Sequence, residues 1–172
     1  MEITEAIRTK RAIRQFKDKA LPEDAVEAIL NAGRRSPTAG NKQYLTFIAI
    51  NDKDTQLKLA ATAQGAAHLG KAEFVIAIVA SGEDYGEAIV NFDIGQAATY
   101  MMLEAWDAGG GSNVARMRDT HAVKLALNLP SDAECQWAIS FGYPADESAT
   151  TAPMKPGGRK ELDEVVRWGK WE

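Results

Sequence analysis

The stretch Arg8-Thr-Lys-Arg-Ala-Ile-Arg-Gln-Phe16 places four cations within seven residues, beside the expected end of a short helix. Further along, Arg34-Arg-Ser-Pro-Thr-Ala-Gly-Asn-Lys-Gln43 supplies a loop of short polar side chains and exposed backbone. Arginine and lysine suit a phosphate through charge-assisted hydrogen bonds, and a polar loop suits a heterocycle. Together the two stretches predict a site for a nucleotide-like ligand.

A cation cluster of this kind can also be the solvated face of a helix. Lys10, Arg11 and Arg14 fall within about one helical turn, close to where the apolar periodicity stops. The net charge of the chain is −4, which argues against general nucleic-acid binding and makes a local basic cluster more informative. These points favour an anion site over a solvated face.

Length and composition predict one globular domain over residues 1–172, because 45% of the residues are hydrophobic and 26% are charged. No apolar run approaches the ~20 residues of a membrane span, and the first residues lack a signal-peptide pattern. A single cysteine, Cys135, excludes an internal disulfide and suits the reducing cytoplasm. Its apolar neighbours suggest a strand, so we expect a structural role for it.

The pattern of apolar residues and stop signals predicts alternating helices and strands. The expected helices run from Ile3 towards Arg11 with Thr4 as N-cap, from Pro22 to Arg35, and over 55–62, 87–107 and 119–127. The expected strands cover 44–50, 74–80, 113–115 and 134–142. This order indicates a sheet sandwiched by helices, in the α+β or α/β class.

Two regions have apolar residues that could pack against a second subunit. The helix over 87–107 is apolar around most of its circumference, which is typical of a buried helix or one shared between subunits. It ends at the glycines 109–111. After a loose polar stretch over 146–158, residues 160–168 carry apolar side chains at a spacing suited to packing. This tail could fold back on its own domain or reach a partner.

The chain lacks the spacing of several common catalytic sites. The histidines, His68 and His121, lie on separate segments, and no H-x-x-x-H or C-x-x-C spacing supports a metal site. No G-x-S-x-G motif indicates a hydrolase, and the glycines 109–111 fit neither a Walker loop nor a dinucleotide fingerprint. A borrowed cofactor is therefore expected to perform the chemistry.

In order and spacing, the chain resembles the FMN-dependent nitroreductase family. The resemblance rests on the two polar stretches quoted first and on segments in the right order across nearly the whole chain. These segments are Phe74–Ala80, Asp93–Ala105, Gly109–Asn113, Phe141–Pro144 and Gly158–Val166. Two positions depart from the family pattern: Ala12 replaces a serine, and Tyr44-Leu45 replaces Pro-Trp.

The resemblance implies an α+β fold, a nitroreductase-like three-layer α/β/α sandwich with a central, mostly antiparallel sheet. It also implies a homodimer whose C-terminal arm is exchanged between subunits. The cofactor would be FMN, with NAD(P)H as co-substrate in a ping-pong hydride transfer to an electron-poor small molecule such as a nitroaromatic, quinone or enone. No catalytic side chain is expected, because the flavin performs the chemistry.

The resemblance also assigns cofactor contacts to positions of this sequence. Lys10, Arg11 and, from the far end of the chain, Arg159 with adjacent Lys160 would reach the phosphate. Arg14 would lie near the pyrimidine edge of the flavin ring, where a cation stabilises the charge gained on reduction. The remaining contacts would come from Ala12, from Ser36, Pro37, Thr38, Ala39 and Asn41 of the other subunit, from Gln64 and His68, and from the backbone of Val114, Ala115 and Arg116.

Two other functions remain open at this stage. The departures at Ala12 and Tyr44-Leu45 touch the cofactor region and favour, slightly, a protein that binds or handles flavin without turnover. A nucleic-acid or anion-binding module built on the basic N-terminus is disfavoured by the acidic total charge.

Overall fold

A four-stranded antiparallel sheet organises the residues that the computed structural model describes, which are 1–82, 86–151 and 158–171. The strand order is β1-β2-β4-β3. The strands are β1 (Leu45–Ile50), β2 (Phe74–Ser81), β3 (Gly111–Arg116) and β4 (Ala133–Gly142). Every strand pair is antiparallel. In this order, β1 and β3 are the two edge strands.

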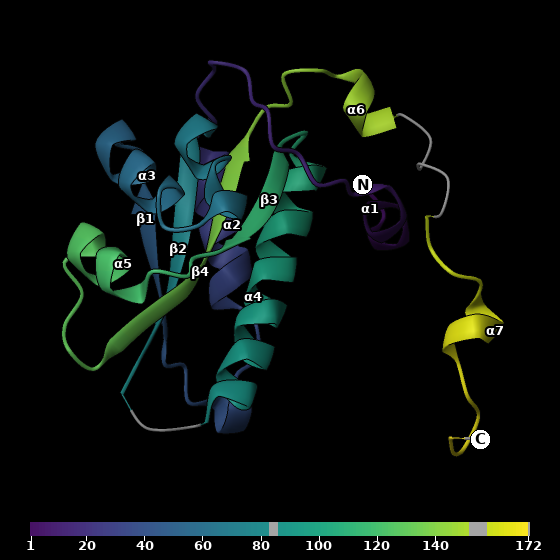
Figure 1. Cartoon of the computed structure of the whole chain (residues 1–172). Coiled ribbons are helices and arrows are strands. Elements are labelled where there is room, and N and C mark those ends of the chain that lie inside the picture. The colour runs from purple at the N-terminus through teal and green to yellow at the C-terminus, as the bar shows by residue number, and fades with distance from the viewer. Residues whose placement is uncertain (83–85, 152–157, 172) are drawn as a thin grey trace.

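Helices cover both faces of this sheet (Figure 1). One face carries α2 (Glu23–Arg34) and α4 (Glu87–Asp107), and the other carries α3 (Lys53–Ala60) and α5 (Thr120–Leu127). Two hydrophobic clusters lie between the layers, one on each side of the sheet. This arrangement is the α/β/α sandwich that the resemblance implied.

The alternation of β2 explains both clusters. Phe74, Ile76 and Ile78 belong to the cluster under α2 and α4, whereas Val75, Ala77 and Val79 belong to the cluster under α3 and α5. Successive side chains of a strand point to opposite faces, so a strand covered on both sides must be apolar throughout. The continuous apolar run over 74–80 is therefore a central strand, as predicted.

Several element boundaries differ from the sequence predictions. The first helix, α1 (Ile3–Thr9), contains Thr4 inside it rather than at its N-cap and ends before Arg11. The third helix begins earlier than predicted, because Asp52 caps it by accepting a hydrogen bond from Thr55 N. The strand β3 begins at Gly111, since pairing with β4 extends strand structure into the glycine turn.

Two glycines let the segment between α1 and α2 lie close to the sheet. Gly111 and Gly142 face each other across β3 and β4. A Cβ added at Gly111 would lie 2.6 Å from the Cβ of Ile13, and one at Gly142 would lie 3.0 Å from Phe16. Both distances are below normal contact, so the absence of side chains at these positions is what permits the close approach.

The C-terminal arm lies apart from the sandwich in Figure 1. It follows α6 (Ser148–Thr151) and contains the short helix α7 (Leu162–Val165). Trp168 and Trp171 are 90% and 87% exposed, and Leu162 and Val165 are also exposed. The predicted loose stretch over 146–158 falls partly outside the described residues, namely at 152–157. Within one chain, the described residues therefore leave these four apolar side chains of the arm uncovered.

Candidate functional site

The basic segment after α1 runs alongside the edge strand β3. Ala12 pairs with Ser112 in parallel orientation, and the Ile13 N–H donates to the Ser112 carbonyl at 3.0 Å. Further along, Lys17 N donates to the Tyr143 carbonyl at 2.8 Å. These contacts fix the backbone on both sides of Arg14, whose side chain is exposed. The segment is therefore a short extension of the sheet that carries cations on its outer side.

Lys10 and Arg14 form a pair of like charges without a counter-ion in the described residues. Lys10 is half-buried, and its Nζ lies 3.4 Å from Met102 Sδ on α4. Burial, followed by the nearby Arg14 cation, lowers the pKa of Lys10. Neither side chain forms an ion pair with a carboxylate in the described part of the chain. Two cations held together without an acid partner fit an anionic group such as a phosphate.

Behind these cations lies a buried polar network centred on His68. Its Nδ1 lies 2.7 Å from Ser140 Oγ, and its Nε2 lies 2.8 Å from Asn113 Nδ2. Ser140 Oγ also donates to the Asn113 carbonyl at 3.2 Å, so it must accept from His68 Nδ1–H. The Nε2 atom then accepts from the Asn113 amide. Both ring nitrogens are engaged, so His68 has none left to bond a ligand.

The imidazole of His68 is neutral at physiological pH. Burial, followed by the Arg14 cation, lowers its pKa to about 4. Arg14 therefore lies within electrostatic reach of both His68 and Lys10. Asn113 and Ser140 are direct partners in the β3–β4 register, which is why residues distant in sequence form one network.

The predicted ring-facing loop after α2 is organised differently. It contains the short 3-10 helix η1 (Ala39–Asn41) and begins with Ser36, whose hydroxyl donates to the Gly33 carbonyl at 2.8 Å. Ala39 N donates to the buried carboxylate of Asp93 on α4 at 2.8 Å, and Tyr44 OH donates to the same oxygen at 2.6 Å. The loop is therefore anchored to the first half of α4.

One chain does not bring all the predicted residues together. Lys10 of the cation pair contacts α4 at Met102 and the loop contacts it at Asp93, nine residues earlier, which corresponds to about 13 Å along a helix. Arg159 and Lys160 are exposed on the C-terminal arm. The structure thus gathers Lys10, Ala12, Arg14 and His68 along β3, and leaves Ser36, Pro37, Thr38, Ala39 and Asn41 at the other end of α4.

The remaining predicted residues lie near β3 with varied surroundings. Val114 and Arg116 point outward from the strand and Ala115 is buried. The Arg116 guanidinium lies over the Trp137 ring at 5.7 Å, and Gln64 is exposed in the 3-10 helix η2 (Gln64–Ala66). The Arg11 guanidinium turns back onto its own segment, where Nη1 donates to the backbone carbonyls of Arg8, Thr9 and Lys10.

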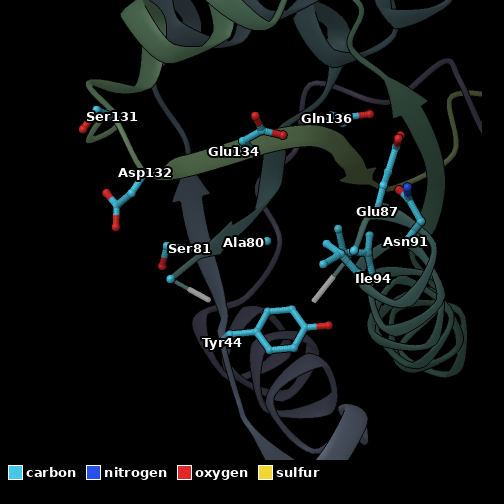
Figure 2. Close-up of a pocket in the computed structure, with 13 residues that line it drawn as sticks. Tyr44, Ala80, Ser81, Glu87, Asn91, Ile94, Ser131, Asp132, Glu134 and Gln136 are labelled. Atoms are coloured by element: carbon cyan, nitrogen blue, oxygen red, sulfur yellow. The ribbon is translucent and has the colours of Figure 1, made fainter. Parts of the chain in front are cut away.

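A separate cavity of ≈ 440 Å³ lies between the first half of α4 and the ends of β2 and β4 (Figure 2). Its lining includes Tyr44, Ile94, Asp132, Glu134 and Gln136. Figure 2 shows the Tyr44 side chain extending from the start of β1 towards α4. None of the predicted cofactor residues lines this cavity.

The sequence analysis missed four residues of the site, Asp93, Ser112, Asn113 and Ser140, and it noted Tyr44 only as a departure from the family pattern. One signal was available, because an acidic residue at position 93 interrupts an otherwise apolar helix face. Buried carboxylates require hydrogen-bond donors, so such a position indicates a built contact. The Asn113–Ser140 pair depends on the strand register and had no such signal.

The comparisons with known proteins agree with this geometry. The model of the nitroreductase family matches residues 7–77 and 65–143 of the chain. The chain belongs to the nitroreductase family. An "NADH dehydrogenase" from Thermus thermophilus is 27% identical in an alignment that covers 92% of the chain and 92% of that protein. A Methanothermobacter thermautotrophicus protein, provisionally named NADH dehydrogenase/NAD(P)H nitroreductase, is 26% identical over 91% of the chain and 84% of its own length.

Solved structures confirm the fold of this nitroreductase-family chain. An FMN-dependent nitroreductase from Clostridium difficile aligns with a TM-score of 0.83, at 21% identity, over 98% of this chain and 100% of that one. Nitroreductase A from Vibrio parahaemolyticus aligns with a TM-score of 0.86, at 20% identity, over 98% of this chain and 76% of that one. The predictions of an α+β nitroreductase-like fold and of an oxidoreductase of this family are both confirmed.

None of the helices in the described ranges is long and apolar enough to cross a membrane. Cys135 is buried, and burial raises the pKa of its thiol to about 12, which fits the predicted structural role.

Proposed function

We propose that this protein is an FMN-dependent oxidoreductase that uses NAD(P)H to reduce electron-poor acceptors such as nitroaromatics, quinones or enones. The observation that carries the proposal is the pair of cations, Lys10 and Arg14, held along β3 without a carboxylate partner in the described residues. The names and cofactors of the nitroreductases that resemble the chain support it.

The residues along β3 have defined roles in this proposal. Lys10 and Arg14 would neutralise the anionic parts of FMN, with Arg159 and Lys160 completing the phosphate site from the arm. The cation of Arg14 would favour the negative charge that the flavin gains on reduction. The backbone of Val114 to Arg116 would face the ring. When bound, FMN supplies the chemistry by accepting a hydride from NAD(P)H and passing the electron pair to the acceptor in a second half-reaction.

We also propose that the protein is a cytoplasmic homodimer. The ring-facing loop and the cation pair contact different parts of α4 in one chain, so a partner subunit would bring Ser36, Pro37, Thr38, Ala39 and Asn41 to the cations. The exposed arm supports this arrangement, because Leu162, Trp168 and Trp171 would then be covered by the partner. An obligate interface of more than about 2,000 Å² would couple dissociation to unfolding.

The test uses the purified protein in two steps. The chromophore released on denaturation is identified by chromatography, and we expect FMN and not FAD. The holoprotein is then mixed with NADH or NADPH and a quinone or nitro acceptor, and we expect steady oxidation of the nicotinamide. A colourless protein that also fails to take up added FMN would contradict the proposal.

The second candidate is a flavin-binding protein without turnover. Ala12 favours it, since its methyl group offers no hydroxyl to the phosphate region beside Ser112. Tight FMN binding with no oxidation of NADH or NADPH by any acceptor would support this candidate over the oxidoreductase.

A further inference from the structure

Asp93 is a buried carboxylate on an apolar helix face. It is 2% exposed and lies beside Ile94 in the cluster between α4 and the sheet. Its Oδ2 accepts from Ala39 N at 2.8 Å and from Tyr44 OH at 2.6 Å, and its Oδ1 accepts from Gln96 Nε2 at 3.3 Å. No lysine or arginine pairs with it in the described ranges. Among the described residues, the partners of this side chain are therefore two backbone or side-chain amides and one hydroxyl.

The loop that Asp93 anchors has an unusual backbone. Gly40, Asn41 and Gln43 all have positive φ values, of 58°, 55° and 53°. A left-handed conformation costs energy at the two residues that carry a side chain, so it persists only where neighbours enforce it. Thr38 Oγ1, which accepts from Gln43 N at 2.9 Å, and Asp93 supply contacts that do so.

Tyr44 closes this set of contacts from the start of β1. Its hydroxyl and the Ala39 amide converge on one carboxylate oxygen from the two ends of the loop. The carboxylate thus ties residue 39 to residue 44 across the strained turn. The hydroxyl belongs to Tyr44, one of the two positions where the sequence departs from the Pro-Trp pattern of the family that it resembles.

We propose that Tyr44 and Asp93 are positioning residues that together hold the loop from Ser36 to Asn41 in the conformation that meets the flavin. The inference rests on the proposed function, in which that loop contacts FMN. Neither residue touches the cofactor in this scheme. They act through the Ala39 amide and the left-handed turn that follows it.

The test compares Tyr44→Phe with a matched control, Tyr100→Phe. The first change removes only the oxygen that bonds Asp93. The second makes the same chemical change on α4, where Tyr100 is 45% exposed and its hydroxyl bonds to no described residue. Hydrogen exchange of the Ala39 amide reports the loop in the apoprotein, and titration with FMN reports the site.

We expect Tyr44→Phe to speed exchange at Ala39 by about tenfold and to raise the Kd for FMN by roughly three- to thirtyfold. Tyr100→Phe should leave both within about twofold. Asp93→Asn should act in the same direction as Tyr44→Phe but more weakly, because its amide oxygen can still accept from Ala39 N and Tyr44 OH, although a neutral amide accepts less strongly than a carboxylate. Loop opening without weaker FMN binding, or weaker binding without loop opening, overturns the proposal.

The two failures are distinguishable. If the wild-type protein does not bind FMN, the proposed function fails. If it binds FMN and Tyr44→Phe behaves like Tyr100→Phe, the positioning role alone fails. Since Tyr44→Phe keeps the aromatic ring in place, the comparison stands even if Asp93→Asn does not fold.

Discussion

The chain carries two half-sites, built in opposite ways. The cationic half-site, with Lys10 and Arg14, is held by backbone pairing to β3 and by close packing against glycines, and its charges are left without counter-ions among the described residues. The loop half-site, from Ser36 to Asn41, is held by one buried carboxyl group, Asp93, whose oxygen accepts hydrogen bonds from within the protein. The cationic half-site can attract an anionic group, and the loop half-site provides a fixed backbone conformation.

The two halves share α4 and are separated along it. That helix contacts Lys10 through Met102 and the loop through Asp93. A rigid helix keeps the halves apart in one subunit, so a complete site requires either a bent helix or a second chain. The exposed arm favours the second chain, and the predictions below test this difference from the largest expected effect to the smallest.

Replacing Trp168 and Trp171 together with alanine should have the largest effect. In the single chain both are exposed, so their loss would change stability by less than about 0.5 kcal/mol. If they anchor the arm on a partner, the loss should weaken the dimer by about 4 kcal/mol. Sedimentation over a dilution series measures this, with Leu125→Ala, a 70% exposed leucine on α5, as control. If the double variant dimerises with unchanged affinity, the arm is not part of the interface.

Arg14→Ala should weaken FMN binding by about 1.5–3 kcal/mol, because it removes a charge-assisted contact from the cationic half-site. The flavin reduction potential should also fall, since the charge of the reduced flavin loses its partner. Arg14→Lys should be milder, because it keeps the charge without the planar fork. Fluorescence titration and a potentiometric titration measure the two quantities. If Arg14→Ala leaves the FMN affinity and the flavin potential unchanged, Arg14 is an ordinary surface residue and not part of the flavin site.

Gly111→Ala tests whether close packing holds the cationic half-site. The added Cβ would lie 2.6 Å from Ile13 Cβ. Ile13 is held in place because its N–H donates to the Ser112 carbonyl. Overpacking of this kind costs about 1–3 kcal/mol and should shift the segment that carries Arg14. Thermal unfolding and FMN titration should both register the change. Gly65→Ala is the control, because its new Cβ meets nothing within 4 Å. If stability and FMN affinity fall equally in both variants, the packing argument is contradicted.

The pH dependence of stability should show His68 as a smaller effect. Its native pKa of about 4 lies below the unfolded value of 6.5, so the unfolded chain takes up the proton first as pH falls. Stability should therefore drop by about 1 kcal/mol from this group between pH 7 and pH 5.5. Denaturant unfolding of wild type and His68→Gln at both pH values isolates the contribution. Equal pH slopes in the two proteins would mean that His68 is not held neutral by its network.

The elements of this fold were largely visible in the sequence, because each depends on local patterning. The apolar run over Phe74–Ala80 and the long helix over 87–107 were found for that reason. The start of β3 at Gly111 was missed, since tertiary pairing with β4 overrides the tendency of glycine to end a helix and begin a turn. Local signals therefore located the layers better than the edges of the sheet.

The two half-sites also differ in how far local sequence signals could reveal them. The cations at 10 and 14 were visible as a cluster in an acidic chain, whereas the network of His68, Asn113 and Ser140 exists only through the β3–β4 register. The anchor of the loop, Asp93, lies nearly fifty residues from Tyr44, and its partners follow from how α4 packs. The cation cluster was predictable from residue type, and the contacts that depend on long-range pairing were not.

The central claim is that one flavin site takes one half from each chain, and a mixed dimer tests it most directly. Chains carrying Arg14→Ala and chains carrying Pro37→Glu are given different tags, co-expressed, and purified as the heterodimer. In a shared-site dimer, one site keeps both halves intact and the other loses both, so about one FMN should bind with wild-type affinity per heterodimer. If each site lies within a single chain, every site carries one lesion, and a heterodimer without any wild-type-affinity site would contradict the claim.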